Sequence, residues 1–134
     1  NDIGLGRIGR LSASMALGDF AESVKQSLGA DHVRFVGTSD RQVAKVAVCG
    51  GSGASLLSSA ARQGADVLVT GDIKYHDARI AESLGVALID AGHFATERIM
   101  IQAFAQQLRG MINTKGFEIE ILPLLCEQDP FSVL

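Results

Sequence analysis

Three stretches of the sequence decide the fold, because each joins a short apolar run to a loop of glycine and polar residues. They are VAKVAVCGGSG (residues 43–53), VLVTGD (67–72) and VALIDAG (86–92). The apolar runs are rich in valine, which favours strands. We therefore predict strands at residues 43–49, 67–70 and 86–89.

A helical pattern follows each of these predicted strands. The predicted helices are residues 54–63, 73–84 and 93–108. Gly64 and Gly85 follow the first two, at the position where helices commonly stop. Alternation of strands and helices is typical of βαβ crossovers, which bury a mostly parallel sheet between helices. The predicted fold is therefore α/β, with three layers, a mostly parallel or mixed sheet, and helices on both faces.

Fewer signals come from the rest of the chain. The further predicted elements are a helix at residues 17–28, a strand at 33–36, a last strand at 117–122 and a turn at 129–131. Residues 1–16 are rich in glycine and serine, and we predict no regular element there. They contain the letters GxGxxG, but no strand precedes this motif, so we do not expect a dinucleotide site.

Length and composition are those of a globular domain. The chain has 134 residues, of which 47% are hydrophobic and 20% charged, and a formal net charge of −3. We expect one domain over residues 1–134, without nucleic-acid or membrane partners, because basic residues are scattered and long apolar runs are absent. Cys49 and Cys126 form no CxxC motif and are expected to be reduced core residues of a cytoplasmic protein. The first residue, Asn1 rather than Met, indicates a fragment or a processed product.

The loops after the three predicted strands form the candidate site. Parallel strands joined by crossover helices bring such loops to the carboxyl edge of the sheet. The first loop contains Gly50, Gly51, Ser52 and Gly53. These glycines either let an anion approach free N–H groups at a helix start or only permit a tight turn, and the sequence leaves both interpretations open.

The second and third loops add ionisable residues. Asp72 and His76 stand four residues apart in the sequence, which predicts one helical face and fits either a surface contact or a functional pair. Asp90 ends the third strand pattern. We expect Asp72 and Asp90, together with the glycine loop, to line a cavity or bind an anion at this edge.

His93 and Glu97 give the strongest local signal. They are also four residues apart, and Met100 and Phe104 continue the same helical stripe. We expect this stripe to face the core, where an imidazole and a carboxylate need partners. A metal ion would serve both side chains, and a buried His–Glu pair without metal is the alternative.

Several motifs, in combination and in order, resemble a known family. They are GLGRIG (4–9), VAVCGGSG (46–53), ADVLVTGDIKYHDA (65–78), LIDAGHFATE (88–97) and DPF (129–131). Nearly the whole chain resembles the C-terminal half of the NGG-interacting-factor-three-like family, whose bacterial members are named GTP cyclohydrolase I type 2 homologues. The resemblance implies half of a duplicated two-lobe fold, a dinuclear metal site between the lobes, and a homohexameric ring. An N-terminal lobe, and in some members a PII-like insertion, would precede Asn1.

The resemblance also implies roles for individual residues. His93 and Glu97 match the HxxxE metal ligands, with Glu97 bridging two ions, and His76 matches a histidine beside the metal cavity. The family's other ligands, a His-His pair and an aspartate, have no counterpart in this chain. Nitrogen and oxygen ligands fit two divalent ions per complete protomer, with Zn, Mn, Fe, Co and Mg all compatible.

The activity implied for the complete protein is metal-dependent hydrolysis of an unidentified small molecule. His76 would be the catalytic acid or base. The alternative is a non-enzymatic metal-binding or scaffold protein that acts through ring assembly. The chain by itself is expected to fold but to be inactive, because it lacks half of the ligands.

Overall fold

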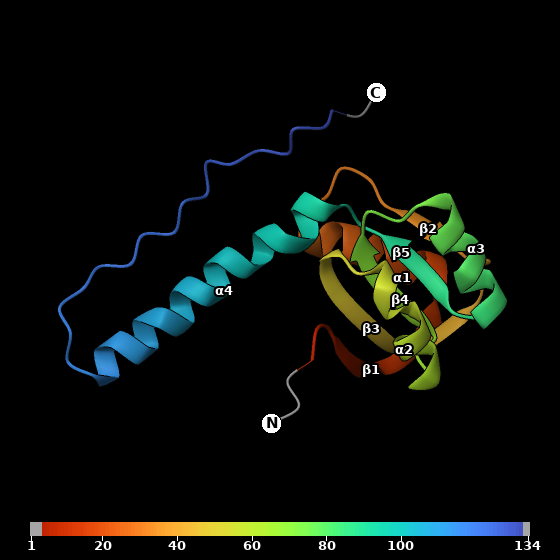
Figure 1. The fold of residues 1–134 in the computed structure, drawn as a ribbon, viewed down its shortest axis with the longest axis horizontal. Coiled ribbons are helices and arrows are strands. Elements are labelled where there is room, and N and C mark those ends of the chain that lie inside the picture. Colours follow the sequence, from red (N-terminus) through yellow and green to blue (C-terminus); the bar gives the residue numbers. More distant parts are fainter. Residues whose placement is uncertain (1–3, 133–134) are drawn as a thin grey trace.

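A five-stranded mixed sheet organises residues 4–132, which the computed structural model describes (Figure 1). The strands are β1 (Arg7–Ala16), β2 (Arg34–Val36), β3 (Gln42–Ser52), β4 (Val67–Gly71) and β5 (Ala87–Asp90). Their spatial order is β1-β3-β4-β5-β2. The central strands β3, β4 and β5 run parallel, whereas the edge strands β1 and β2 pair antiparallel with β3 and β5. The predicted α/β class with a mixed sheet is confirmed.

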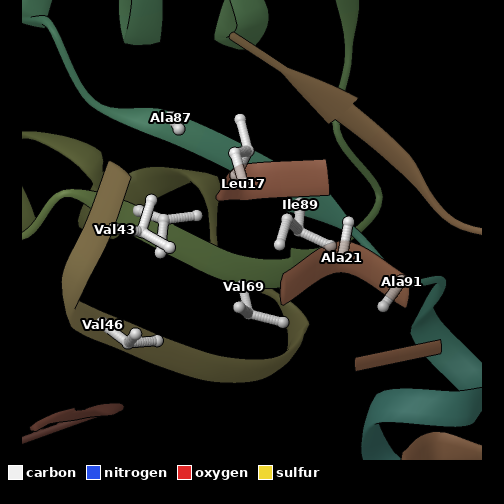
Figure 2. Close-up of a cluster of buried hydrophobic side chains, with 9 residues drawn as sticks. Leu17, Ala21, Val43, Val46, Val69, Ala87, Ile89 and Ala91 are labelled. Carbon is white, nitrogen blue, oxygen red and sulfur yellow. The ribbon is translucent and has the colours of Figure 1, made fainter. Parts of the chain in front are cut away.

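Helices cover both faces of this sheet. They are α1 (Leu17–Leu28), α2 (Leu57–Arg62), α3 (Tyr75–Leu84) and α4 (His93–Thr114), with a 3₁₀ turn at Ala54–Leu56. Side chains of the central strands alternate between two cores. Val67 and Val69 pack with α1 in the cluster of Figure 2, whereas Leu68 packs with α2 and α3 on the other face. The sheet is therefore the middle of three layers, as predicted.

Local signals explain where two of the helices begin and end. Gly29 and Gly85 follow α1 and α3 in the left-handed conformation, which glycine adopts without steric cost. α3 begins at Tyr75 rather than at the predicted residue 73. The Asp77 carboxylate accepts a hydrogen bond from the Lys74 N–H at 3.0 Å, which caps the helix there.

One strand near the beginning of the chain is absent from the prediction. The sequence predicts no element in residues 1–16, yet Arg7–Ala16 forms β1. Small and polar residues hide the alternation that indicates a strand, because only Leu11 and Met15 reach the core. Pairing with β3 gives this edge strand its conformation.

The end of the chain differs most from prediction. α4 continues to Thr114, beyond the predicted residue 108, and projects away from the sheet (Figure 1). The strand predicted at 117–122 is wrong: these residues form no regular element, since no strand of residues 4–132 lies beside them to complete a ladder. The predicted turn at 129–131 is present, with Phe131 N–H donating to Asp129 Oδ1 at 2.9 Å.

Both cysteines are free, but neither is a core residue. Cys49 is half-buried in β3, and Cys126 is exposed in the segment after α4. The expected core position is therefore wrong for both, and most clearly for Cys126, because its segment does not pack on the sheet. Among residues 4–132, no helix is both long enough and apolar enough to cross a membrane.

Candidate functional site

The loops after β3, β4 and β5 meet at one edge of the sheet, as the sequence predicts. In the parallel ladders, Ser52 lies opposite Gly71, and Thr70 lies opposite Asp90. Gly71 packs against the backbone that leads into α4, because a Cβ added there would come within 2.7 Å of His93 N. Glycine therefore allows the second and third loops to touch.

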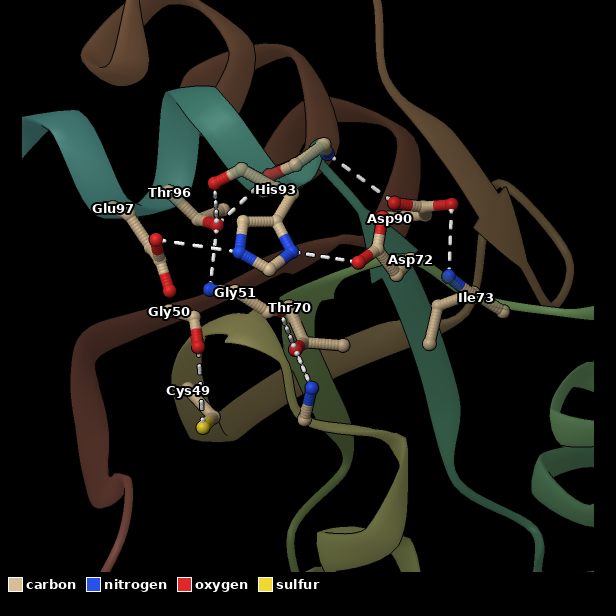
Figure 3. Close-up of polar contacts among 12 residues, drawn as sticks. Cys49, Gly50, Gly51, Thr70, Asp72, Ile73, Asp90, His93, Thr96 and Glu97 are labelled. Carbon is tan, nitrogen blue, oxygen red and sulfur yellow. Dashed lines mark hydrogen bonds and ion pairs between the residues drawn. The ribbon is translucent and has the colours of Figure 1, made fainter.

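His93, the first residue of α4, lies between two carboxylates (Figure 3). Its Nδ1 is 2.6 Å from Asp72 Oδ2, and its Nε2 is 3.3 Å from Glu97 Oε2. Asp72 reaches the ring because it lies in the loop after β4 with a φ of 58°, outside α3. The prediction that Asp72 and His76 share a helical face is therefore wrong, and the partner of Asp72 is His93.

The carboxylates change the protonation of His93. The hydrogen bond to Asp72 raises the pKa of His93, the negative charge of Glu97 raises it further, and partial desolvation opposes both.

The side chains of His93 and Glu97 are 47% and 57% exposed. Met100 and Phe104 on the same stripe are exposed too. The expected core-facing stripe is therefore wrong, because α4 leaves the sheet and these side chains stay exposed instead of packing into either core.

The glycine loop predicted at residues 50–53 packs against the His93–Glu97 pair, and its first three residues form the irregular end of β3 instead of a loop beyond residue 49. β3 shifts its register on β4 between Val48 and Ser52, and Gly51 adopts a φ of 63°. A Cβ on Gly51 would lie 2.4 Å from Glu97 Oε1 and 3.2 Å from His93 Nε2. Glycine at this position leaves the space in which the pair lies.

Two threonine hydroxyls accept hydrogen bonds from backbone amides of this segment. Gly51 N–H donates to Thr96 Oγ1 at 2.9 Å, and Gly53 N–H donates to Thr70 Oγ1 at 2.8 Å. These two amides are not available to an anion, so tight packing accounts for both glycines. Of the other loop residues, Gly50 lies close to the Thr96 carbonyl and Ser52 is exposed.

A cavity of about 940 Å³ opens beside the pair. Asp72 and Asp90 line it together with His93 and Glu97, whereas the glycine loop does not. Two arginines that the sequence does not single out also line it: Arg34 on β2 and Arg98 on α4, whose guanidinium lies 5.8 Å from the centre of the Phe94 ring. Only the pairing of β2 with β5 brings Arg34 here, and no local motif signals that.

His76 lies on the same edge but not in this cavity. It is the second residue of α3, is exposed, and packs edge-on against Tyr75 with ring centres 5.6 Å apart. No hydrogen bond within residues 4–132 joins it to His93 or Glu97. A direct role beside the pair therefore stays a prediction.

The pair fits part of a metal site. Two ligands of one ion, each bound at about 2.1 Å, lie roughly as far apart as His93 Nε2 and Glu97 Oε2. The carboxylate on Nδ1 is the partner that metal-bound histidines usually have. However, the described residues contain no group of three or more His, Cys, Asp and Glu side chains that could hold a metal ion, because Asp72 contacts the other ring nitrogen of His93. The described chain therefore offers a pair of donors and no complete site.

Curated proteins named GTP cyclohydrolase 1 type 2 homolog match nearly the whole of this chain. The GTP cyclohydrolase 1 type 2 homolog of Bacillus subtilis is 44% identical over 131 residues, and the protein of that name from Staphylococcus aureus strain MRSA252 is 40% identical over 131 residues. Each match covers 98% of this chain but only 35% and 36% of the respective relative. The chain thus spans about a third of the length of the curated relatives it matches.

Solved structures also match nearly the whole of this chain. A Bacillus cereus protein related to NIF3 superimposes with a TM-score of 0.91 at 44% identity, over 98% of this chain and 36% of that chain. A Staphylococcus aureus protein superimposes with a TM-score of 0.92 at 39% identity, over 98% of this chain and 42% of that chain. The family model described as Duf34/NIF3 (NGG1p interacting factor 3) matches residues 1–130. The chain therefore belongs to the Duf34/NIF3 family.

Proposed function

We propose that this chain contributes His93 and Glu97 as ligands of a divalent metal ion in a metal-dependent hydrolase. The observation that carries the proposal is that two acceptors face each other. When Nδ1–H is donated to Asp72, a neutral His93 ring presents its Nε2 lone pair to Glu97 Oε2, 3.3 Å away. This arrangement is unfavourable unless a cation lies between the two atoms. Either a proton on Nε2 or a metal ion would serve.

Each residue would have a separate role in such a site. A bound divalent metal supplies Lewis acidity and lowers the pKa of a coordinated water. His93 would bind through Nε2 and Glu97 through its carboxylate, while Asp72 would hold the imidazole in one orientation through Nδ1. The remaining ligands would come from outside residues 4–132, and the curated relatives extend well beyond the matched segment.

His76 is our candidate for proton transfer in the complete protein. Imidazole is the side chain that titrates nearest to neutral pH, and His76 is exposed at the edge of the sheet that holds the pair. We expect His76→Ala to lower turnover while metal stays bound. Loss of metal from His76→Ala, with no separate effect on the rate, would make it a ligand instead.

Metal content tests the ligand assignment. We expect His93→Ala and Glu97→Gln each to weaken Zn²⁺ or Mn²⁺ binding by tenfold or more while the fold is retained, because each removes one of two donors. Glu82→Gln, on the exposed surface of α3, is the matched control and should bind as the unchanged chain does. Unchanged metal content in both ligand variants, by elemental analysis, would show that a protonated His93 paired with Glu97 explains the geometry.

A metal-binding scaffold is the second candidate function, and the exposed apolar side of α4 favours it. Ile99, Met100 and Phe104 are 54%, 59% and 52% exposed. Clusters of this kind commonly mark interfaces, and a homohexameric ring would bury them. A screen of metal-dependent hydrolysis on the complete protein separates the two functions. Turnover that Glu97→Gln abolishes supports the enzyme, whereas an intact ring without turnover supports the scaffold.

A further inference from the structure

Asp90 is the one charged residue among residues 4–132 that is buried, at 9% exposed. A carboxylate in such a place is costly unless hydrogen-bond donors replace the water that it loses. Asp90 has three donors. Oδ2 accepts from the Arg34 guanidinium and from Ile73 N–H at 3.3 Å, and Oδ1 accepts from Gly92 N–H at 3.2 Å.

Each donor belongs to a different segment of the candidate site. Ile73 directly follows Asp72 in the loop after β4, and Gly92 directly precedes His93. Arg34 lies opposite Asp90 in the β2–β5 ladder, and its guanidinium also donates to the Ile73 carbonyl at 3.1 Å. The Asp90 carboxylate thus lies between the two loops that carry Asp72 and His93 (Figure 3).

We infer that Asp90, held by Arg34, is the positioning residue of this site. The 2.6 Å contact between Asp72 and His93 joins the loop after β4 to the start of α4, so it forms only when both segments are correctly placed. Asp90 bonds to the residue next to each of them and fixes one loop relative to the other. For metal affinity this inference rests on the proposed function. For the placement of the His93 ring it does not.

A second aspartate shows what a purely structural carboxylate does in this fold. Asp66 precedes β4, and its Oδ2 accepts the N–H groups of Ala44 at 2.9 Å and Lys45 at 2.7 Å. It therefore ties the beginnings of β3 and β4 together at the edge opposite the candidate site. Asp66 is a matched control, because its loss weakens the same sheet without touching the loops at His93.

The test measures the placement of the His93 ring directly. In ¹⁵N-labelled protein, the Nδ1–H resonance of His93 reports its hydrogen bond to Asp72, and a Zn²⁺ titration reports affinity. We expect Asp90→Asn to broaden or abolish this resonance and to weaken Zn²⁺ binding about 10–100-fold, the usual effect of losing a residue that orients a ligand. Arg34→Gln should do the same to a smaller extent, and Arg34→Lys should restore part of the signal.

Asp66→Asn should lower the melting temperature and leave the His93 resonance and Zn²⁺ affinity unchanged. A folded Asp90→Asn protein with an unchanged His93 resonance would overturn the inference, and so would an equal effect of Asp66→Asn. If Asp90→Asn does not fold, Arg34→Gln decides by the same two readouts. If the complete protein, with these residues unchanged, binds no Zn²⁺, the proposed function fails, and the resonance alone still tests the positioning role.

Discussion

His93 contacts carboxylates at both ring nitrogens, so its charge is the property of the site that responds most directly to pH. The pKa of this imidazole is raised, first by the hydrogen bond to Asp72. A histidine with a raised pKa in the folded state stabilises that state at pH values below its unfolded pKa of about 6.5. The stabilisation is lost as the pH rises through the higher, folded value.

We predict that Asp72→Asn lowers the pKa of His93 toward its ordinary value, because the amide keeps an acceptor but loses the negative charge. Titration of the His93 ring by NMR, without metal, measures this change. Denaturant unfolding should also lose part of its pH dependence above about pH 6.5 in this variant. The exposed helical variant Glu82→Gln should alter neither. An unchanged His93 pKa in Asp72→Asn would contradict the contact between the two side chains.

At the scale of elements, one residue joins the beginnings of the parallel strands. Besides its two carboxylate bonds to β3, Asp66 donates its backbone N–H to the Lys45 carbonyl at 2.7 Å, and its backbone carbonyl accepts from Ala87 N–H at 2.9 Å. Partial burial raises the pKa of Asp66, but the hydrogen bonds from Lys45 and Ala44 lower it more. Asp66 therefore stabilises the fold above its unfolded pKa of about 3.9, and this is lost as the pH falls through the lower, folded value.

We predict that Asp66→Ala lowers the free energy of unfolding by about 1–2 kcal/mol at pH 7, because two strand amides lose their acceptor. Urea denaturation at pH 7 and near pH 3 measures it. The difference between the two proteins should shrink at the lower pH, where the Asp66 carboxyl of the unchanged chain begins to protonate. A difference that stays the same size at both pH values would contradict a role for the charge.

At the scale of the whole molecule, the sheet and α1–α3 form a packed unit, whereas α4 and the residues after it carry much exposed apolar surface. Phe117, Ile119 and Leu122 beyond α4 are 57%, 58% and 71% exposed. On α4 itself, Glu97 borders the cavity. The side of α4 that the proposed metal site would use thus faces the segment after α4 across an open cavity and stays largely exposed.

We predict that the isolated chain folds but binds no more than one divalent ion, and that one weakly. Its two cores suffice for folding. Its donors do not suffice for a dinuclear centre, because no group of three in the described chain could hold an ion and a catalytic zinc site usually needs three protein ligands. Titration calorimetry with Zn²⁺ and Mn²⁺ measures the stoichiometry. Tight binding of two ions per chain would show that the missing ligands are assigned wrongly.

Sequence patterns identified most of the central fold because the interactions that specify its strands and helices join residues close together in the sequence. Valine-rich runs become the buried central strands, Gly29 and Gly85 end helices in the left-handed conformation, and loops after parallel strands must share an edge. The spacing of His93 and Glu97 likewise follows from one helix and needs no knowledge of the rest of the chain. These features depend on residues only a few positions apart.

Tertiary structure alone decided the features that depend on distant residues. β1 exists because β3 offers an edge to its small, polar residues, and residues 117–122 form no strand because no edge within residues 4–132 pairs with them. Asp72 meets His93 because a φ of 58° turns it out of the helix toward the neighbouring loop. Arg34 meets Asp90 because β2 pairs with β5, 56 residues away along the chain. Such contacts leave no periodic trace in the sequence, since they form only when separately encoded elements pack together.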